Sequence, residues 1–270
     1  MTFTSYGFFW SFGNYLLPDF LGILSGSTFS FTHPNIQYGT SGQDFINGTI
    51  KNDYIIGRAG DDGIWGFEGN DYIDAGRGND GVWGGAGHDT IYGGYGNDEL
   101  FGEDGNDRIY GEDGDDVLQG NNGDDYLSGG AGNDLMSGGE GRDSMYGGTG
   151  NDYMMGEAGN DLLDGGSGRD YLAGGDGNDT LTGGLDQDSF YFTKGHDVIT
   201  DFDTGGWFSK AEQIGIDVEG IDSYAQLMAT ARQSGFLLFV NTTFDFGNGD
   251  SLTLNGVRMS ELNESMFTFV

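Results

Sequence analysis

An aspartate recurs at every ninth residue along one long segment of the chain, from Asp44 to Asp188, without an insertion or a deletion. It occupies the sixth place of the phrase Gly-Gly-x-Gly-x-Asp-x-U-x, where U is a large apolar residue. The phrase occurs seventeen times between Gly39 and Tyr191. A carboxylate in a glycine turn can join main-chain carbonyls in presenting several oxygen atoms to one point, and Ca²⁺ prefers oxygen ligands. The pattern therefore predicts calcium binding.

The candidate ligands are the sixth-place aspartates. The regular units supply Asp62, Asp71, Asp80, Asp89, Asp98, Asp107, Asp116, Asp125, Asp134, Asp143, Asp152, Asp161, Asp170 and Asp179. Asp44, Asp53 and Asp188 belong to the end units, where Lys51 and Asp186 replace the fourth-place glycine of units two and seventeen. A solvated acidic face is the alternative interpretation. It does not explain aspartate, rather than glutamate or asparagine, at seventeen successive positions.

The net charge of −34 restricts both partners and folding. Six basic residues face 32 acidic ones in the repeats, a net charge of −26 over 153 residues. Nucleic acid is excluded as an expected partner, because phosphate backbones bind Lys- and Arg-rich surfaces. Such a chain should stay disordered unless its charge is neutralised.

The sequence contains no cysteine, so neither disulfides nor thiolate metal sites stabilise it. Residues 1–50 carry no Lys or Arg, so we expect no N-terminal secretory signal of the usual kind. The apolar stretch Tyr15–Leu24 is interrupted by Pro18 and Asp19 and is too short to span a bilayer.

The repeat also predicts its own backbone. Glycines at places one, two and four permit positive φ, and the Asn or Asp common at place five tolerates the left-handed region. Places seven to nine should form a three-residue strand with only the eighth residue facing a core. Strands this short become stable only when each unit stacks on its neighbours.

These units resemble the haemolysin-type calcium-binding repeats of the RTX proteins, most plainly in Gly84–Tyr92, Gly129–Ser137 and Gly174–Thr182. The resemblance implies an all-β fold, a right-handed parallel β-roll solenoid in which two units make one turn. It also implies that calcium lies between stacked loops two units apart, held by the aspartate carboxylates and by loop carbonyls. Seventeen loops offer about fifteen such gaps, and we expect roughly 12–15 Ca²⁺ ions because repeat arrays fray at their ends.

Residues 192–270 resemble the C-terminal region that follows such repeats in RTX proteins, beginning with Phe190–Phe192 and Gly195–Asp203. We expect a small capping region there. It should contain a helix over Tyr224–Gln233, with Ser223 and Gln226 as a capping box and Gly235 at its end. Strands are expected at Phe236–Val240 and Ser251–Leu254, with a turn at Gly247–Asp250 before the second.

The segment Glu264–Val270, acidic and then apolar, resembles the uncleaved signal read by type I secretion machinery of Gram-negative bacteria. The alternative is a strand that caps the roll, and both can hold. The resemblance therefore implies an extracellular protein.

The first 38 residues are rich in aromatic side chains and carry one charge, Asp19. We interpret residues 1–38 as a cap on the first repeat. The alternative is a segment that inserts into a membrane or a partner.

Ninth-place aromatic residues should form ladders on the outer faces. Trp65, Trp83 and Phe101 would stack on one sheet, with Gly63 and Gly81 leaving room for the rings, and Tyr92 and Tyr110 on the other. Such a ladder could bind a polysaccharide or another cell-surface ligand. The favoured interpretation is docking of the N-terminal segment or cross-strand packing.

No catalytic motif accompanies the repeats: the sequence lacks His-Glu-x-x-His, Gly-x-Ser-x-Gly and a phosphate-binding Gly-x-x-x-x-Gly-Lys. We therefore expect a secreted, non-enzymatic protein that folds on binding extracellular calcium and acts at a surface, in a matrix or on a host. An accessory or remnant module of an RTX exoenzyme, epimerase- or protease-like, is the alternative. Ice binding is less favoured, because only Thr149 supplies a threonine loop.

Overall fold

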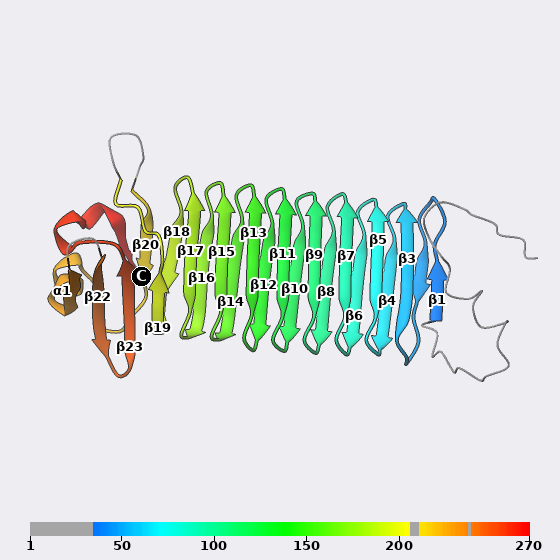
Figure 1. Cartoon of the computed structure of the whole chain (residues 1–270), viewed down its shortest axis with the longest axis horizontal. Coiled ribbons are helices and arrows are strands. Elements are labelled where there is room, and N and C mark those ends of the chain that lie inside the picture. The colour runs from blue at the N-terminus through cyan, green and yellow to red at the C-terminus, as the bar shows by residue number, and fades with distance from the viewer. Residues whose placement is uncertain (1–34, 206–210, 237–238) are drawn as a thin grey trace, which may run out of the picture. The chain divides into compact units, whose positions relative to one another are not determined.

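The computed structural model describes residues 35–205, 211–236 and 239–270. Residues 1–34 lie outside this range, and with them most of the predicted N-terminal cap. The described chain forms a parallel β-solenoid of about nine turns, followed by a small region with one short α-helix and further strands (Figure 1). This confirms the predicted fold class.

Each turn of the solenoid contributes one strand to each of two parallel sheets. The odd-numbered strands of the first sheet are β1 (Asn35–Tyr38), β3 (Asp53–Ala59), β5 (Tyr72–Arg77), β7 (Thr90–Tyr95), β9 (Arg108–Asp113), β11 (Tyr126–Ala131), β13 (Ser144–Thr149), β15 (Leu162–Ser167), β17 (Thr180–Leu185) and β19 (Lys194–Ile199). The even-numbered strands of the second are β2 (Phe45–Asn47), β4 (Gly63–Glu68), β6 (Gly81–Ala86), β8 (Glu99–Asp104), β10 (Val117–Asn122), β12 (Leu135–Glu140), β14 (Tyr153–Gly159), β16 (Tyr171–Gly177) and β18 (Ser189–Phe192).

The register between neighbouring strands equals two repeats. Trp65 lies opposite Trp83, and Leu127 lies opposite Met145, eighteen residues on. Every place of the phrase therefore stacks on the same place two units later. This is the geometry that the nine-residue period predicts.

The strands are longer than predicted. Most of them run from place seven through place three of the next unit, six residues instead of three, as in β5 and β6. Identical glycine turns stack so closely that their backbones also pair: the N–H of Gly60 donates to the carbonyl of Arg77 at 2.7 Å. Only places four to six are left for the turn.

One side chain per unit fills the interior. The eighth-place residues, from Ile55 through Leu100 and Met145 to Phe190, are at most 2 % exposed. Burying each contributes on the order of 2 kcal/mol. A core one residue wide is thin for its length, so the turns at both edges of the sheets must supply further stability.

The C-terminal region extends both sheets of the roll. Strand β23 (Asp250–Asn255) pairs in parallel with β19, while β20 (Gln213–Ile216) joins β18 to β24 (Phe267–Phe269). The strands β21 (Ala231–Phe236) and β22 (Phe239–Gly247) continue antiparallel from β23. Two 3₁₀ turns, Met259–Glu261 and Glu264–Met266, precede β24.

The helix α1 (Tyr224–Thr230) begins as predicted, because Ser223 Oγ accepts a hydrogen bond from the N–H of Gln226. Its predicted end was wrong: the chain leaves the helix at Ala231 and forms β21, so Gly235 lies in a strand. The predicted strand Phe236–Val240 was also wrong, since β21 ends at Phe236 and β22 begins at Phe239. The predicted turn after Gly247 is confirmed.

The outer aromatic ladders form as predicted. The rings of Trp65 and Trp83 stack with centroids 5.1 Å apart and planes 4° apart, and Phe101 follows at 5.6 Å. A Cβ on Gly63 would lie 3.0 Å from the Trp65 ring. On the other sheet Tyr92 and Tyr110 stack at 4.8 Å. The ring faces cover one another, so cross-strand packing contributes to the ladders.

Candidate metal centre

The sixth-place aspartates form a buried row along each edge of the roll, which we call the aspartate columns. All of them from Asp53 to Asp188 are at most 4 % exposed, and Asp44 at the first turn is half-buried. Neighbours within a column lie two units apart. The turn forces this placement, because the sixth-place aspartate lies two residues before the eighth-place residue that enters the core.

One oxygen of each carboxylate joins adjacent turns. Oδ1 of Asp89 accepts a hydrogen bond from the N–H of Asp71 at 2.7 Å, and this contact recurs for each pair from Asp44 and Asp62 to Asp179 and Asp197. The shared hydrogen bond explains why glutamate never replaces aspartate. The glutamate side chain is one methylene longer, so it would carry the carboxylate past the N–H that aspartate meets.

The other oxygen has no partner. Oδ2 is buried without a hydrogen bond in every sixth-place aspartate from Asp62 to Asp188, and again in Asp197. A buried, unpartnered carboxylate oxygen is costly, and native proteins normally satisfy such groups. A repeated series of them indicates that a cation completes each turn.

The surroundings of these oxygens form a cradle that a side chain would fill. A Cβ on first-place Gly84 would lie 2.5 Å from Asp89 Oδ2 and 2.9 Å from the carbonyl oxygen of Gly102, two units later. The carbonyl of fourth-place Gly60 likewise points at fourth-place Gly78. Between two stacked turns, carboxylate and carbonyl oxygens thus approach a region that glycine leaves open in most units, with Ala75 at the first place of unit five as an exception.

Main-chain oxygens must supply most of any coordination shell. Among the residues with described positions, no three His, Cys, Asp or Glu side chains converge as a metal site. Calcium takes six to eight oxygen ligands in flexible geometry, and it accepts carbonyls readily. The donor set therefore fits Ca²⁺ and does not fit a metal that requires nitrogen or sulfur ligands.

Burial makes the columns electrostatically unfavourable without a counter-ion. It raises the pKa of Asp89, Asp98 and Asp125 to about 7, with adjacent column carboxylates adding to the effect and the Oδ1 hydrogen bond opposing it. The pKa of Asp71 and that of Asp116 rise to about 6 for the same main reason. A divalent ion would favour the ionised forms.

The fifth-place residues stabilise the stack in a way the sequence interpretation missed. They were expected to adopt the left-handed region, but positive φ occurs at places two and four, as in Phe67 and Gly69. Instead, the side chain of Asn70 accepts a hydrogen bond from the N–H of His88 two units later. Asn and Asp recur at place five because their short side chains reach the next turn.

The structure adds Asp197 to the predicted residues. Its Oδ1 accepts from the N–H of Asp179, its Oδ2 is unpartnered, and burial raises its pKa to about 8. The signal was present in the sequence, since Gly195, Asp197 and Ile199 keep places four, six and eight of an eighteenth unit. Phe192 at its first place concealed the repeat.

Comparison with known proteins agrees with this geometry. The family model for the RTX calcium-binding nonapeptide repeat matches eight overlapping segments that together span residues 38–199, more than half of the chain. The chain therefore belongs to the RTX calcium-binding repeat family, whose repeats bind multiple Ca²⁺ ions. It is a calcium-binding β-roll protein, and the repeat region is a structural unit that is not itself catalytic.

Solved structures with a similar fold include the extracellular lipase LipA from Serratia marcescens, at 19 % identity and a TM-score of 0.39. The alignment covers 74 % of this chain and 45 % of the lipase, so the chain spans less than half of that protein. No curated protein matches the sequence. In the described ranges, no helix has the length and apolar character needed to cross a membrane.

Proposed function

We propose that the sixth-place aspartates hold calcium between turns two units apart, and that this binding drives folding of the roll outside the cell. The observation that carries the proposal is the unbroken series of buried, unpartnered Oδ2 atoms from Asp62 to Asp197. Each ion would take Oδ2 of one turn and the first-place carbonyl of the turn two units later. It would supply positive charge where the chain has none.

The folding linkage follows from charge. The columns bring buried carboxylates together without basic partners, so the metal-free roll opposes its own collapse. Binding free energy then becomes folding free energy, because the cradle exists only when two turns stack. Extracellular sites with affinities of about 10⁻⁴–10⁻³ M would be empty in the cytosol and filled outside.

Export before folding is consistent with the C-terminal packing. Met266 is 1 % exposed and Phe267 is 7 % exposed, and β24 pairs with β20. The buried part of a type I secretion signal within Glu264–Val270 would therefore become accessible only in the unfolded chain, whereas Glu264, Ser265, Thr268 and Val270 are exposed in the folded one. This supports secretion through that machinery, with calcium encountered afterwards.

We place the protein at a surface, in a matrix or on a host, without catalysis of its own. The Trp65, Trp83 and Phe101 ladder is the candidate contact for a polysaccharide or cell-surface ligand. A glycan array tests it: binding that Trp65→Ala and Trp83→Ala abolish supports the contact, and binding that survives both changes contradicts it.

Circular dichroism tests the calcium-dependent folding directly. The calcium-free chain should give a coil spectrum that converts to a β spectrum on adding millimolar Ca²⁺, and excess chelator should reverse the change. Mg²⁺ at the same concentration is the control, since it demands octahedral geometry and retains water. A β spectrum in the absence of calcium would contradict the proposed linkage.

A further inference from the structure

The gaps between stacked turns are not equivalent along the roll. We propose that the two gaps at its N-terminal end are closed by the protein's own hydrogen-bond donors, so that calcium fills only the later gaps. This inference rests on the proposed function, because it concerns which cradles of the same kind remain open.

Unit one closes its own carboxylate. Both the N–H and the hydroxyl of Thr40 donate to Oδ2 of Asp44, at 2.6 and 2.9 Å. The same hydroxyl also lies 3.2 Å from the fourth-place carbonyl of Gly42. The carboxylate oxygen that an interior turn leaves unpartnered is thereby engaged within the turn.

Unit two repeats this arrangement. The N–H and the hydroxyl of Thr49 donate to Oδ2 of Asp53, at 2.6 and 3.0 Å. The unpartnered oxygen of Asp53 is Oδ1, the atom that in later units accepts from the aspartate two units earlier. From Asp62 onward no second-place side chain donates to Oδ2, and the oxygen is unpartnered.

A basic side chain links units one and three beside the first gap. Nη1 of Arg58 donates to the carbonyl of Gly39 at 3.0 Å, and the guanidinium lies 5.3 Å from the centre of the Tyr38 ring. Arg58 occupies the second place of unit three, directly above unit one in the stack. It brings a fixed positive charge to this end of the roll.

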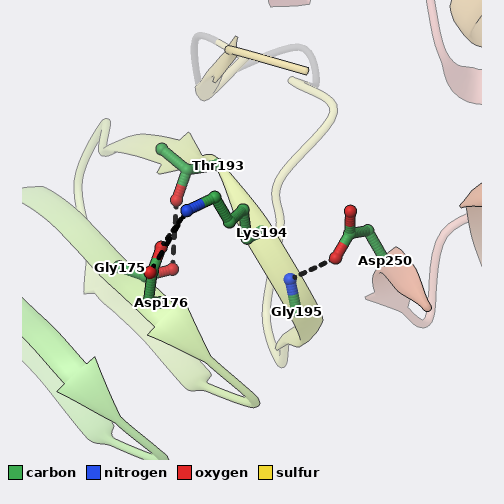
Figure 2. Close-up of polar contacts among 6 residues, drawn as sticks. All are labelled: Gly175, Asp176, Thr193, Lys194, Gly195 and Asp250. Atoms are coloured by element: carbon green, nitrogen blue, oxygen red, sulfur yellow. Dashed lines mark hydrogen bonds and ion pairs between the residues drawn. The ribbon is translucent and has the colours of Figure 1, made fainter. Parts of the chain in front are cut away.

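The last gap, between unit sixteen and the eighteenth unit, stays open at its carboxylate, because Asp179 Oδ2 is buried without a partner, and donors there reach main-chain carbonyls instead (Figure 2). The Thr193 hydroxyl donates to the second-place carbonyl of Gly175 at 3.0 Å. The carbonyl of Phe192, in the first place of the eighteenth unit, accepts from the N–H of Asp217 at 3.0 Å. Lys194 Nζ lies 3.0 Å from Asp176 Oδ1 beside them, an exposed pair that adds charge rather than much stability.

The closed N-terminal gaps have a physical rationale. Within the described residues, β2 of unit one pairs only with β4, so an ion there would depend on fewer stacked turns. Donors from the chain satisfy the same oxygens without a metal. Eighteen units leave about sixteen gaps, of which about fourteen would remain open to calcium.

Native mass spectrometry of the calcium-loaded chain tests the inference by counting ions. We expect about fourteen bound ions in the wild type. Replacing both threonines with the second-place consensus residue, Thr40→Gly with Thr49→Gly, should raise the count by two. The matched control is Asn121→Gly, at an interior second place with φ 76°, and it should leave the count unchanged.

The outcomes separate the two proposals. A wild type that binds no calcium overturns the proposed function. A wild type that fills all of about sixteen gaps overturns the proposal of closed N-terminal gaps while leaving calcium binding intact. This outcome is measured on the wild type alone, so it does not depend on whether a variant folds. An unchanged count in a folded double variant likewise overturns the role of the threonines.

Discussion

A single carboxylate in this protein serves two turns at once. Oδ1 accepts the N–H of the aspartate two units earlier, and Oδ2 is left for a cation. Removing the charge while keeping the shape should separate the two roles, since an Asn oxygen can still accept the hydrogen bond.

Asp125→Asn is therefore expected to lower the calcium stoichiometry by one or two ions and to weaken cooperative folding, as measured by calorimetric titration. The neighbouring Asp124→Asn is a matched control. Asp124 Oδ1 accepts the N–H of Arg142 at 2.9 Å, a role that Asn retains. Equal losses in both variants would show that net charge, rather than the column position, matters.

The raised carboxylate pKa values also predict that acid substitutes in part for calcium. The pKa of Asp125 and that of Asp134 are about 7 in the folded roll, against 3.8 for an ordinary aspartate. Between those values the metal-free folded state binds more protons than the unfolded chain. Its stability is therefore greatest below about pH 4 and is lost as the pH rises towards 7.

In calcium-free buffer, lowering the pH from 7.5 to about 4.5 should increase the β signal in circular dichroism. The calcium-loaded protein should show the opposite trend, because protons compete with the ion for the same oxygens. A metal-free spectrum that does not change with pH would argue against unpaired buried carboxylates.

At the scale of the strand and turn, glycine determines whether a cradle exists. Gly84→Ala would place a Cβ 2.5 Å from Asp89 Oδ2, where something must shift. We expect it to remove one ion and to lower the free energy of unfolding of the loaded protein by about 2 kcal/mol or more, measured by denaturant titration. Gly42→Ala is the control, since its Cβ would meet nothing within 4 Å; an equal loss there would contradict the cradle.

The strands and the helix also show how much of this fold could be predicted from the sequence. The nine-residue period was enough to predict the parallel stack, the register and the eighth-place core. It did not predict that strands extend through places one to three, because glycine rarely favours strands outside such a stack. The end of α1 was missed for a similar reason: the pairing of β21 with β22 outweighs the helix propensity of Ala231 and Arg232.

The sixth-place aspartates show the same limit of prediction at the candidate site. Their positions could be predicted from spacing alone. The distinction between an open turn and one closed by Thr40 or Thr49 depends on which donor meets Oδ2, a contact with no periodic signature. Asp197 was missed because an irregular first place hid an otherwise regular unit.

For the molecule as a whole, about fourteen divalent ions would bring about +28, against a repeat charge of −26. The roll is then close to neutral along its length while the flanking regions stay acidic. The one-residue core and the ion columns stabilise the same stack, so neither should persist when the other is lost.

Anomalous X-ray scattering from calcium-loaded crystals tests the central claim most directly. The account predicts a peak in each interior gap, about 2.3–2.6 Å from an aspartate Oδ2 and from main-chain carbonyl oxygens. A well-ordered roll whose interior gaps hold no such peaks, with those carboxylates turned to solvent, would contradict it.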